Sequence, residues 1–178
     1  MTEKRKKIII IGATSGIGRE MALIYLKQGH QVAITGRRSK LLDELKVLFP
    51  DQVITACFDV QDPEITSYLD YLNKALQGFD LLIYSAGVGH PSKVLSLEAE
   101  LRTTLTNVNG FVSTANYAFA HFLEQGYGQL AVISSIAGLQ GNSWTPAYSA
   151  SKAFASNYAQ GLNMKAFQLQ AKIVVTDI

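Results

Sequence analysis

Tyr148 and Lys152 are the pair of residues in this 178-residue chain whose types and spacing best suit proton transfer. They lie four residues apart in "TPAYSASKAFASNYAQ" (145–160), a run typical of a helix, and would therefore share one helical face. A free tyrosine ionises only at a pH of about 10, but an ammonium group one helical turn away stabilises the phenolate. The pair could exchange a proton with a substrate oxygen. The alternative is that Tyr148 is only a packed aromatic ring and Lys152 only a solvated charge.

A glycine-rich turn follows the first apolar run of the chain. "GATSGIG" places Gly12, Gly16 and Gly18 directly after "KIIIIG" (7–12). Glycines allow a strand to turn sharply into a helix and let the backbone approach a pyrophosphate, which the amides of the helix N-terminus then bind. The spacing differs from G-x-G-x-x-G, and Arg19 follows where a P-loop has its lysine, so a P-loop ATPase is disfavoured. A turn that serves only packing is the alternative.

Two arginines end the second apolar run, which reads "ITGRRSK". An acidic residue at this position binds the ribose of NAD, whereas a cation suits the 2′-phosphate of NADP. Arg37 and Arg38 therefore favour NADP(H) over NAD(H), because guanidinium groups form paired hydrogen bonds with phosphate. The alternative is that both arginines only solvate the start of a helix.

Apolar runs alternate with amphipathic segments along the whole chain. The runs predict strands at 7–12, 31–36, 53–60, 80–87, 128–135 and 171–178. The segments between them predict helices at 17–29, 39–49, 63–78, 97–125 and 146–168. This alternation indicates an α/β fold, a doubly wound, Rossmann-like parallel sheet with helices on both faces and ligands at the carboxyl ends of the strands. We expect residues 1–7 to form a basic N-terminal tail and residues 8–178 to form one dinucleotide-binding domain that carries the catalytic residues.

Composition disfavours several other classes of protein. The net charge is only +2, and the basic "EKRKK" (3–7) has no interleaved aromatic residues, so we expect a solvated tail and no nucleic-acid partner. No apolar stretch is long enough to span a bilayer. The single cysteine, Cys57, lies in an apolar run and suggests a buried thiol in a reducing cytoplasm. We expect a cytoplasmic protein with no membrane partner and no metal site.

From Ile8 onward, the order of "GATSGIG", "YSAG", "LTNVNG", "ISS" and "YSASK" resembles the short-chain dehydrogenase/reductase family in its single-domain form. The resemblance implies that the glycine turn, the pair after the third strand and the Ala-Gly after the fourth strand bind the cofactor. In the family, the pair after the third strand contacts adenine. The two arginines join this set on their chemistry. These residues are Gly12, Thr14, Ser15, Gly16, Ile17, Gly18, Arg37, Arg38, Asp59, Val60, Ala86 and Gly87.

The same resemblance implies a catalytic set of Asn107, Ser135, Tyr148 and Lys152. Tyr148 would be the general acid and base, and Lys152 would stabilise its phenolate. Both residues would also contact the cofactor, Lys152 through the nicotinamide ribose. Ser135, thirteen residues before Tyr148, would hold the substrate oxygen. Asn107 would hold a water that links Lys152 to solvent. We therefore expect an NADP(H)-dependent oxidoreductase that transfers a hydride between the nicotinamide and a small-molecule carbonyl or alcohol; a non-catalytic dinucleotide-binding sensor or scaffold is the alternative.

The chain departs from the family pattern at two places. Tyr84 and Ser85 replace an asparagine pair, so the hydrogen bonds of those asparagines must be made otherwise. Family members also continue, beyond the position of Ile178, into a Pro-Gly turn, a seventh strand and a substrate-covering region. We expect this C-terminal strand and substrate region to be missing from the chain. Leu139 and Trp144 are candidates for an apolar substrate pocket, and packing at the sheet edge explains them equally well.

Helices 97–125 and 147–168 carry more apolar residues than one sheet face would cover. The residues on which this rests are Ala115, Ala118, Phe119, Phe122, Ala150, Ala153 and Phe154. Such surface suggests pairing with another subunit, and the family resemblance implies pairing through the same helices. We expect a homodimer or a homotetramer.

Overall fold

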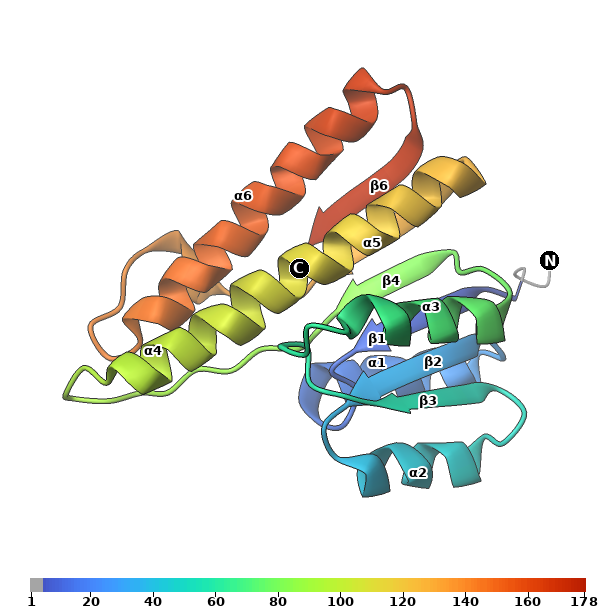
Figure 1. Ribbon diagram of the computed structural model, residues 1–178, viewed down its shortest axis with the longest axis horizontal. Coiled ribbons are helices and arrows are strands. Elements are labelled where there is room, and N and C mark those ends of the chain that lie inside the picture. The colour runs from blue at the N-terminus through green and yellow to red at the C-terminus, as the bar shows by residue number, and fades with distance from the viewer. Residues whose placement is uncertain (1–4) are drawn as a thin grey trace.

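The computed structural model describes residues 5–178, which form one six-stranded sheet with helices on both sides (Figure 1). The strands are β1 (Lys7–Ile11), β2 (Gln31–Gly36), β3 (Val53–Cys57), β4 (Leu81–Tyr84), β5 (Tyr127–Val132) and β6 (Lys172–Asp177). The helices are α1 (Gly16–Lys27), α2 (Ser39–Leu48), α3 (Ile65–Leu76), α4 (Leu97–Thr104), α5 (Gly110–Gln125) and α6 (Pro146–Gln168). A π-helical turn, η1 (Leu105–Asn109), joins α4 to α5, and a 3₁₀ turn, η2 (Ile136–Leu139), follows β5.

All pairings in the sheet are parallel, and the strand order is β3-β2-β1-β4-β5-β6. Ile8 pairs with Val32 of β2 on one side and with Leu81 of β4 on the other, so the order reverses at β1. Sheets of this kind bind ligands at the carboxyl ends of the strands beside the reversal. The predicted doubly wound α/β fold is confirmed.

Alternate residues of β1 pack into two separate cores. Ile8 and Ile10 belong to the core beneath α1 and α2, which also contains Leu26 and Leu42. Ile9 and Ile11 belong to the larger core beneath α3, α5 and α6. The strand reads as a continuous apolar run because both of its faces are buried.

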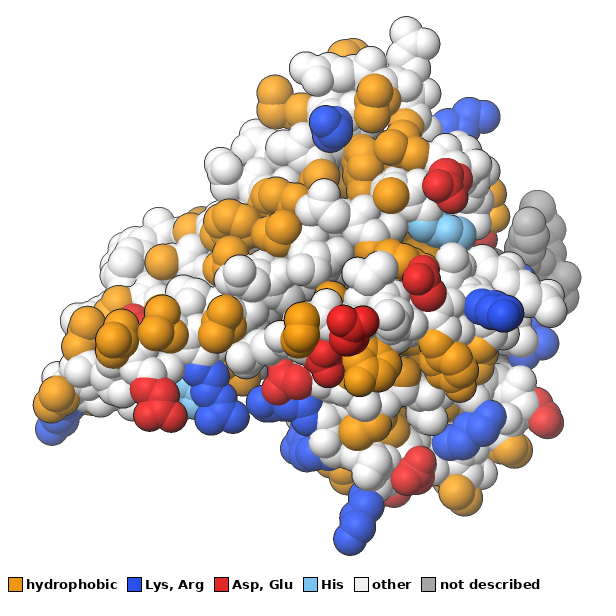
Figure 2. Space-filling model, viewed as in Figure 1, with side chains coloured by type: hydrophobic (Ala, Val, Ile, Leu, Met, Phe, Trp, Pro, Cys, Tyr) orange, Lys and Arg blue, Asp and Glu red, His pale blue; other side chains and the backbone are white. Residues whose placement is uncertain are grey.

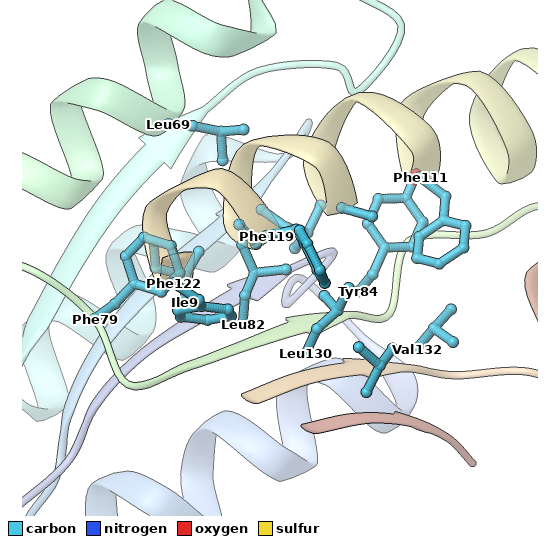
Figure 3. Packing of buried hydrophobic residues seen from close by; sticks show 14 of the residues in the cluster. Ile9, Leu69, Phe79, Leu82, Tyr84, Phe111, Phe119, Phe122, Leu130 and Val132 are labelled. Carbon is cyan, nitrogen blue, oxygen red and sulfur yellow. The ribbon is translucent and has the colours of Figure 1, made fainter. Parts of the chain in front are cut away.

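Helix α5 contributes Phe111, Phe119 and Phe122 to the larger core, where they surround Leu82 and Tyr84 of β4 (Figure 3). Full burial of such side chains stabilises the fold by about 1.5–3 kcal/mol each. Ala115 and Ala118 are also fully buried. The core therefore includes Ala115, Ala118, Phe119 and Phe122, which the sequence suggested as surplus apolar surface, because α5 packs against β4, β5 and β6.

The helix predicted at 97–125 is not regular, since η1 interrupts it around Asn107. Helix α6 begins at Pro146 and ends at Gln168 as predicted, with the proline in the first turn where it needs no N–H partner. The prediction of a buried Cys57 was wrong, because it is the last residue of the edge strand β3 and is exposed. Residues 1–4 of the expected basic tail lie outside the described residues, and β1 already begins at Lys7.

Candidate active site

A cavity of about 1140 Å³ opens at the carboxyl ends of the strands, where the sequence predicted a ligand site. It is bordered by the glycine turn, by both arginines of the second strand end, by the residues after β3 and β4, and by the start of α6. Among the predicted residues it is lined by Gly12, Thr14, Ser15, Gly16, Ile17, Arg37, Arg38, Asp59, Val60, Ala86, Gly87, Ser135, Tyr148 and Lys152. Gly18 and Asn107 are not among the lining residues.

The glycine turn shows why its glycines are needed. Gly12 has φ +88°, and a Cβ there would lie 2.6 Å from the backbone nitrogen of Ala86. A Cβ on Gly18 would lie 2.4 Å from the carbonyl oxygen of Gly12. Gly16 has φ +57° with no heavy atom near its Cβ position, and Ser15, the N-cap of α1, makes no side-chain capping bond. The first amides of α1 are therefore available beside the cavity, as binding of a pyrophosphate requires.

Arg38 and Arg37 differ in their surroundings. Arg38 donates to Thr14 Oγ1 from Nε (3.1 Å) and Nη2 (2.6 Å), and to Ser15 Oγ from Nη2 (2.6 Å). Arg37 instead pairs with the carboxylate of Asp59, at 3.4 Å from Nη1 to Oδ2. Within residues 5–178, only Arg37 of the two has a carboxylate partner, so the charge of Arg38 is the one left for a phosphate group.

Asp59 and Val60 line the cavity where β3 ends, at the edge of the sheet opposite the β5–β6 side on which Tyr148 and Lys152 of α6 lie. Asp59 accepts the Arg37 guanidinium through Oδ2 and the backbone N–H of Gln61 through Oδ1, at 3.1 Å. Phe58 adds an aromatic border to the same part of the cavity. This arrangement suits the adenine end of a dinucleotide.

Helix α6 brings Tyr148 and Lys152 together at the other part of the cavity. Lys152 Nζ lies 5.6 Å from the centroid of the Tyr148 ring and donates to the carbonyl oxygen of Ile133 at 2.6 Å. Lys152 is only 7% exposed, and burial lowers its pKa below the ordinary value. The loop after β4 packs against Tyr148, since a Cβ on Gly89 would lie 2.9 Å from the tyrosine ring. The lysine is thus held by the backbone of the strand end, and its charge is shielded from solvent.

The two serines after β5 have different partners. Ser134 shares a hydrogen bond of 2.8 Å with Ser156 and donates to the carbonyl oxygen of Lys152 at 3.3 Å, so its hydroxyl is turned toward α6. Ser135 accepts the backbone N–H of Ala137 at 3.1 Å, and its hydroxyl proton remains free to be donated. Ser135 is therefore the serine whose hydroxyl suits a substrate oxygen.

Asn107 is 4% exposed, and its amide joins three segments. Its Oδ1 accepts from the backbone of Val88 at 2.8 Å, and its Nδ2 donates to the Val88 carbonyl and to Ser151 Oγ, both at 2.9 Å. Ser151 in turn donates to the carbonyl oxygen of Tyr148 at 2.7 Å. Asn107 thereby links the loop after β4 to the first turns of α6. Its Oδ1 retains one lone pair and, like Lys152 Nζ, borders the Cβ position of Gly87, at 3.6 and 3.5 Å.

Some partners of the site could not be recognised from the sequence. Lys152 and Asn107 bind backbone groups of Ile133 and Val88, and every residue carries such groups. Ser151 could have been suspected, because it lies one helical turn from Tyr148 inside "YSASK". Leu139 and Trp144 do not line the large cavity as expected; Leu139 borders a smaller cavity of about 550 Å³ between η2 and α6, and Trp144 lies under the Lys93 ammonium. Among residues 5–178, no helix has the length and apolarity to cross a membrane, and no cluster of side chains suits a metal ion.

The order of the strands and the glycine turn at the reversal define a Rossmann-type nucleotide-binding protein. Residues 6–177 match the family model described as short chain dehydrogenase, and the chain belongs to this family of oxidoreductases. Nicotinamide dinucleotides are the cofactors typical of it.

Individual relatives share about a third of their residues or less with the chain. An uncharacterized oxidoreductase of Mycobacterium tuberculosis is 32% identical over 182 residues, which cover 97% of this chain and 72% of that protein. A probable NADP-dependent dehydrogenase of Haemophilus influenzae is 28% identical over 179 residues, covering 98% of this chain and 70% of that one. Among solved structures, the closed form of a serine dehydrogenase complexed with NADP+ is similar with a TM-score of 0.89 and 28% identity, over 96% of this chain and 70% of that chain.

Proposed function

We propose that the chain is an NADP(H)-preferring oxidoreductase that interconverts a small-molecule carbonyl and the corresponding alcohol, with Tyr148 as the general acid and base. The observation that carries the proposal is the position of Ser135, Tyr148 and Lys152 on the same cavity as the uncapped start of α1. A cavity of about 1140 Å³ has room for a dinucleotide together with a small substrate.

The preference for NADP(H) rests on Arg38. Its guanidinium is held by two hydroxyl groups of the glycine turn, so its donors are oriented beside the start of α1 while its charge has no carboxylate partner among residues 5–178. A 2′-phosphate beside Thr14 and Ser15 would complete this arrangement. The Haemophilus influenzae relative is described as a probable NADP-dependent dehydrogenase, and the serine dehydrogenase structure contains NADP+, which supports the same cofactor.

In the direction of reduction, Tyr148 donates its phenolic proton to the oxygen of the substrate carbonyl. A bound NADPH supplies the hydride. Lys152 stabilises the phenolate that remains, because its ammonium lies near the ring and is shielded from solvent. The bond to Ile133 fixes the lysine so that its charge does not swing away.

Ser135 holds the substrate oxygen beside Tyr148. Its hydroxyl is oriented by the N–H of Ala137, which occupies an oxygen lone pair and leaves the proton for the substrate. Positioning of this kind supplies both orientation and stabilisation of the developing charge. Ser134 does not take this role, since its hydroxyl is engaged with Ser156.

Asn107 supports the site in two ways. Its amide fixes Val88 and Ser151, and through Ser151 it fixes the turn of α6 that carries Tyr148. Its Oδ1 and Lys152 Nζ border the same place beside Gly87, where a water would connect the lysine to solvent and return the proton to Tyr148.

The experiment that tests the proposal is a screen for NADPH oxidation over ketones, aldehydes and quinones, accompanied by direct measurement of NADPH and NADH binding. Reduction of at least one carbonyl supports the enzyme. Tight binding of NADPH with no reduction of any carbonyl would instead favour a dinucleotide-binding sensor or scaffold, and no binding of either cofactor would contradict both.

We also propose a homodimer or homotetramer in the cytoplasm, assembled through the face formed by α4, α5 and α6. Leu97, Leu101 and Leu105 follow one another at helical spacing along α4 and η1 and are 74%, 52% and 43% exposed. Figure 2 shows hydrophobic side chains gathered along the part of the surface where α4 lies in Figure 1. Light scattering on the purified protein measures the assembly, and a monomer at all concentrations would contradict it.

A further inference from the structure

Tyr84 occupies a place where the family pattern has an asparagine, and its side chain reaches a segment that an asparagine is too short to contact in the same way. It is the last residue of β4 and only 2% exposed, with its ring 5.2 Å from that of Phe111 (Figure 3). Its hydroxyl donates to the carbonyl oxygen of Thr106 at 2.6 Å. Burial, with the charge of Asp59 adding to it, raises the pKa of Tyr84, so the hydroxyl stays a donor.

Thr106 lies within the π-helical turn η1. There the N–H of Gly110 donates to the carbonyl oxygen of Leu105, five residues earlier and not four. Such turns are rare and are frequently found at functional sites. The Tyr84 hydroxyl binds the carbonyl next to the widened step, so it stabilises the turn in its wide form.

Two further contacts fix this arrangement. Gln61 Nε2 donates to Thr106 Oγ1 at 2.8 Å, so Thr106 is bound through both its side chain and its backbone. A Cβ on Gly110 would lie 2.8 Å from the Tyr84 hydroxyl oxygen and 2.8 Å from Val60 Cγ2. The hydroxyl is therefore enclosed between η1 and the residues after β3.

Asn107 is the residue directly after Thr106, so the rotation of η1 decides where its amide points. That amide makes three hydrogen bonds, to both backbone groups of Val88 and to Ser151. All three depend on one orientation of the side chain. A regular α-helical turn would rotate Asn107 about the helix axis and would break at least part of this set.

We propose that Tyr84 is a positioning residue for catalysis, which holds the π-turn so that Asn107 can bind Val88 and Ser151 and thereby orient the turn of α6 that carries Tyr148. The inference rests on the proposed function, because it assigns Tyr84 a role in the same reaction. It also explains how the chain replaces the missing asparagine pair after β4. A purely structural role, in which Tyr84 only fills the core, predicts different results in the tests that follow.

The first test is a double-mutant cycle on kcat with the variants Tyr84→Phe and Asn107→Ala. Tyr84→Phe removes one oxygen and keeps the ring in the core. We expect it to lower kcat by about 5- to 30-fold in the otherwise unchanged protein, as loss of one buried hydrogen bond would. In the Asn107→Ala protein the same change should cost nothing further. Equal losses in both backgrounds would overturn the inference.

A control removes another tyrosine hydroxyl that donates a hydrogen bond, at a site away from Asn107. Tyr117 on α5 donates to Asp70 Oδ1 at 2.8 Å, so Tyr117→Phe should leave kcat unchanged. Melting temperatures of both variants report the structural cost separately. A loss of kcat in Tyr117→Phe equal to that in Tyr84→Phe would mean that kcat follows stability, which would also overturn the inference.

The second test does not need activity, so it separates this inference from the proposed function. The side-chain amide of Asn107 gives two proton resonances in a ¹⁵N correlation spectrum, and its bonds should slow their exchange with water. We expect Tyr84→Phe to shift these signals and speed their exchange, and Tyr117→Phe to leave both as they were. Unchanged signals in Tyr84→Phe would overturn the inference even in an active enzyme, whereas shifted signals in a protein that reduces no carbonyl would refute only the catalytic proposal.

Discussion

Replacement of Arg38 by alanine should weaken the binding of NADPH selectively. Hydrogen bonds to charged groups contribute about 1.5–3 kcal/mol, and Arg38 is an exposed residue, so solvent screening reduces this to about 1–2 kcal/mol. The dissociation constant for NADPH should then rise about 5- to 30-fold. The hydroxyls of Thr14 and Ser15, which lose their partner, line the cavity and can bind water, so no further cost is expected.

Calorimetric titration of NADPH and NADH into the wild type, Arg38→Ala and Arg37→Ala measures this effect. NADH binding should be unchanged in Arg38→Ala, because NADH has no 2′-phosphate. Arg37→Ala is the matched control, and its loss should be smaller because its guanidinium is shared with Asp59. Equal losses of NADPH and NADH affinity in Arg38→Ala would refute the assignment, and so would a larger NADPH-specific loss in Arg37→Ala.

Two further predictions concern Lys152 and the space beside it. Gly87→Ala should keep the fold, because the added Cβ would make ordinary contacts of 3.5 Å with Lys152 Nζ and 3.6 Å with Asn107 Oδ1. The Cβ would take the place of a bridging water, so kcat measured at saturating NADPH should fall by about 10-fold. An unchanged kcat would argue against that water. Burial lowers the pKa of Lys152 below 10.5, so at alkaline pH the unfolded chain binds more protons than the folded one. The difference in free energy of unfolding between the wild type and Lys152→Met, measured by urea titration, should therefore rise as the pH approaches 10.5. A difference that falls with rising pH would have the wrong sign.

Much of the fold could be predicted from the sequence because local chemistry determines it. The run "KIIIIG" is apolar on both faces and becomes the central strand β1, and Pro146 starts α6 where a proline fits a first turn. The limits of the helices differ from the predicted ones by up to two residues, because hydrogen bonding at helix ends depends on the neighbouring loop.

The finer geometry of the site depends on contacts between distant segments, and the sequence does not contain them. Arg37 and Arg38 look equivalent as letters, yet Asp59 pairs with only one of them. No local sequence pattern predicts the π-turn at Asn107, because the hydroxyl that binds it belongs to Tyr84, 22 residues before Thr106. The expectation that the apolar residues of α5 form exposed surface was wrong for a similar reason. The sequence of a helix does not tell which part of a sheet the helix covers.

The proton-donor role of Tyr148 is tested most directly by the variant Tyr148→Phe. The variant keeps the ring against Gly89 and near Lys152 and removes only the hydroxyl. In a single-turnover measurement with bound NADPH and a carbonyl found in the screen, the rate of NADPH oxidation should fall by about 100-fold or more, with the dissociation constant for NADPH unchanged. Oxidation at the wild-type rate in Tyr148→Phe would contradict the assignment of Tyr148 as the proton donor.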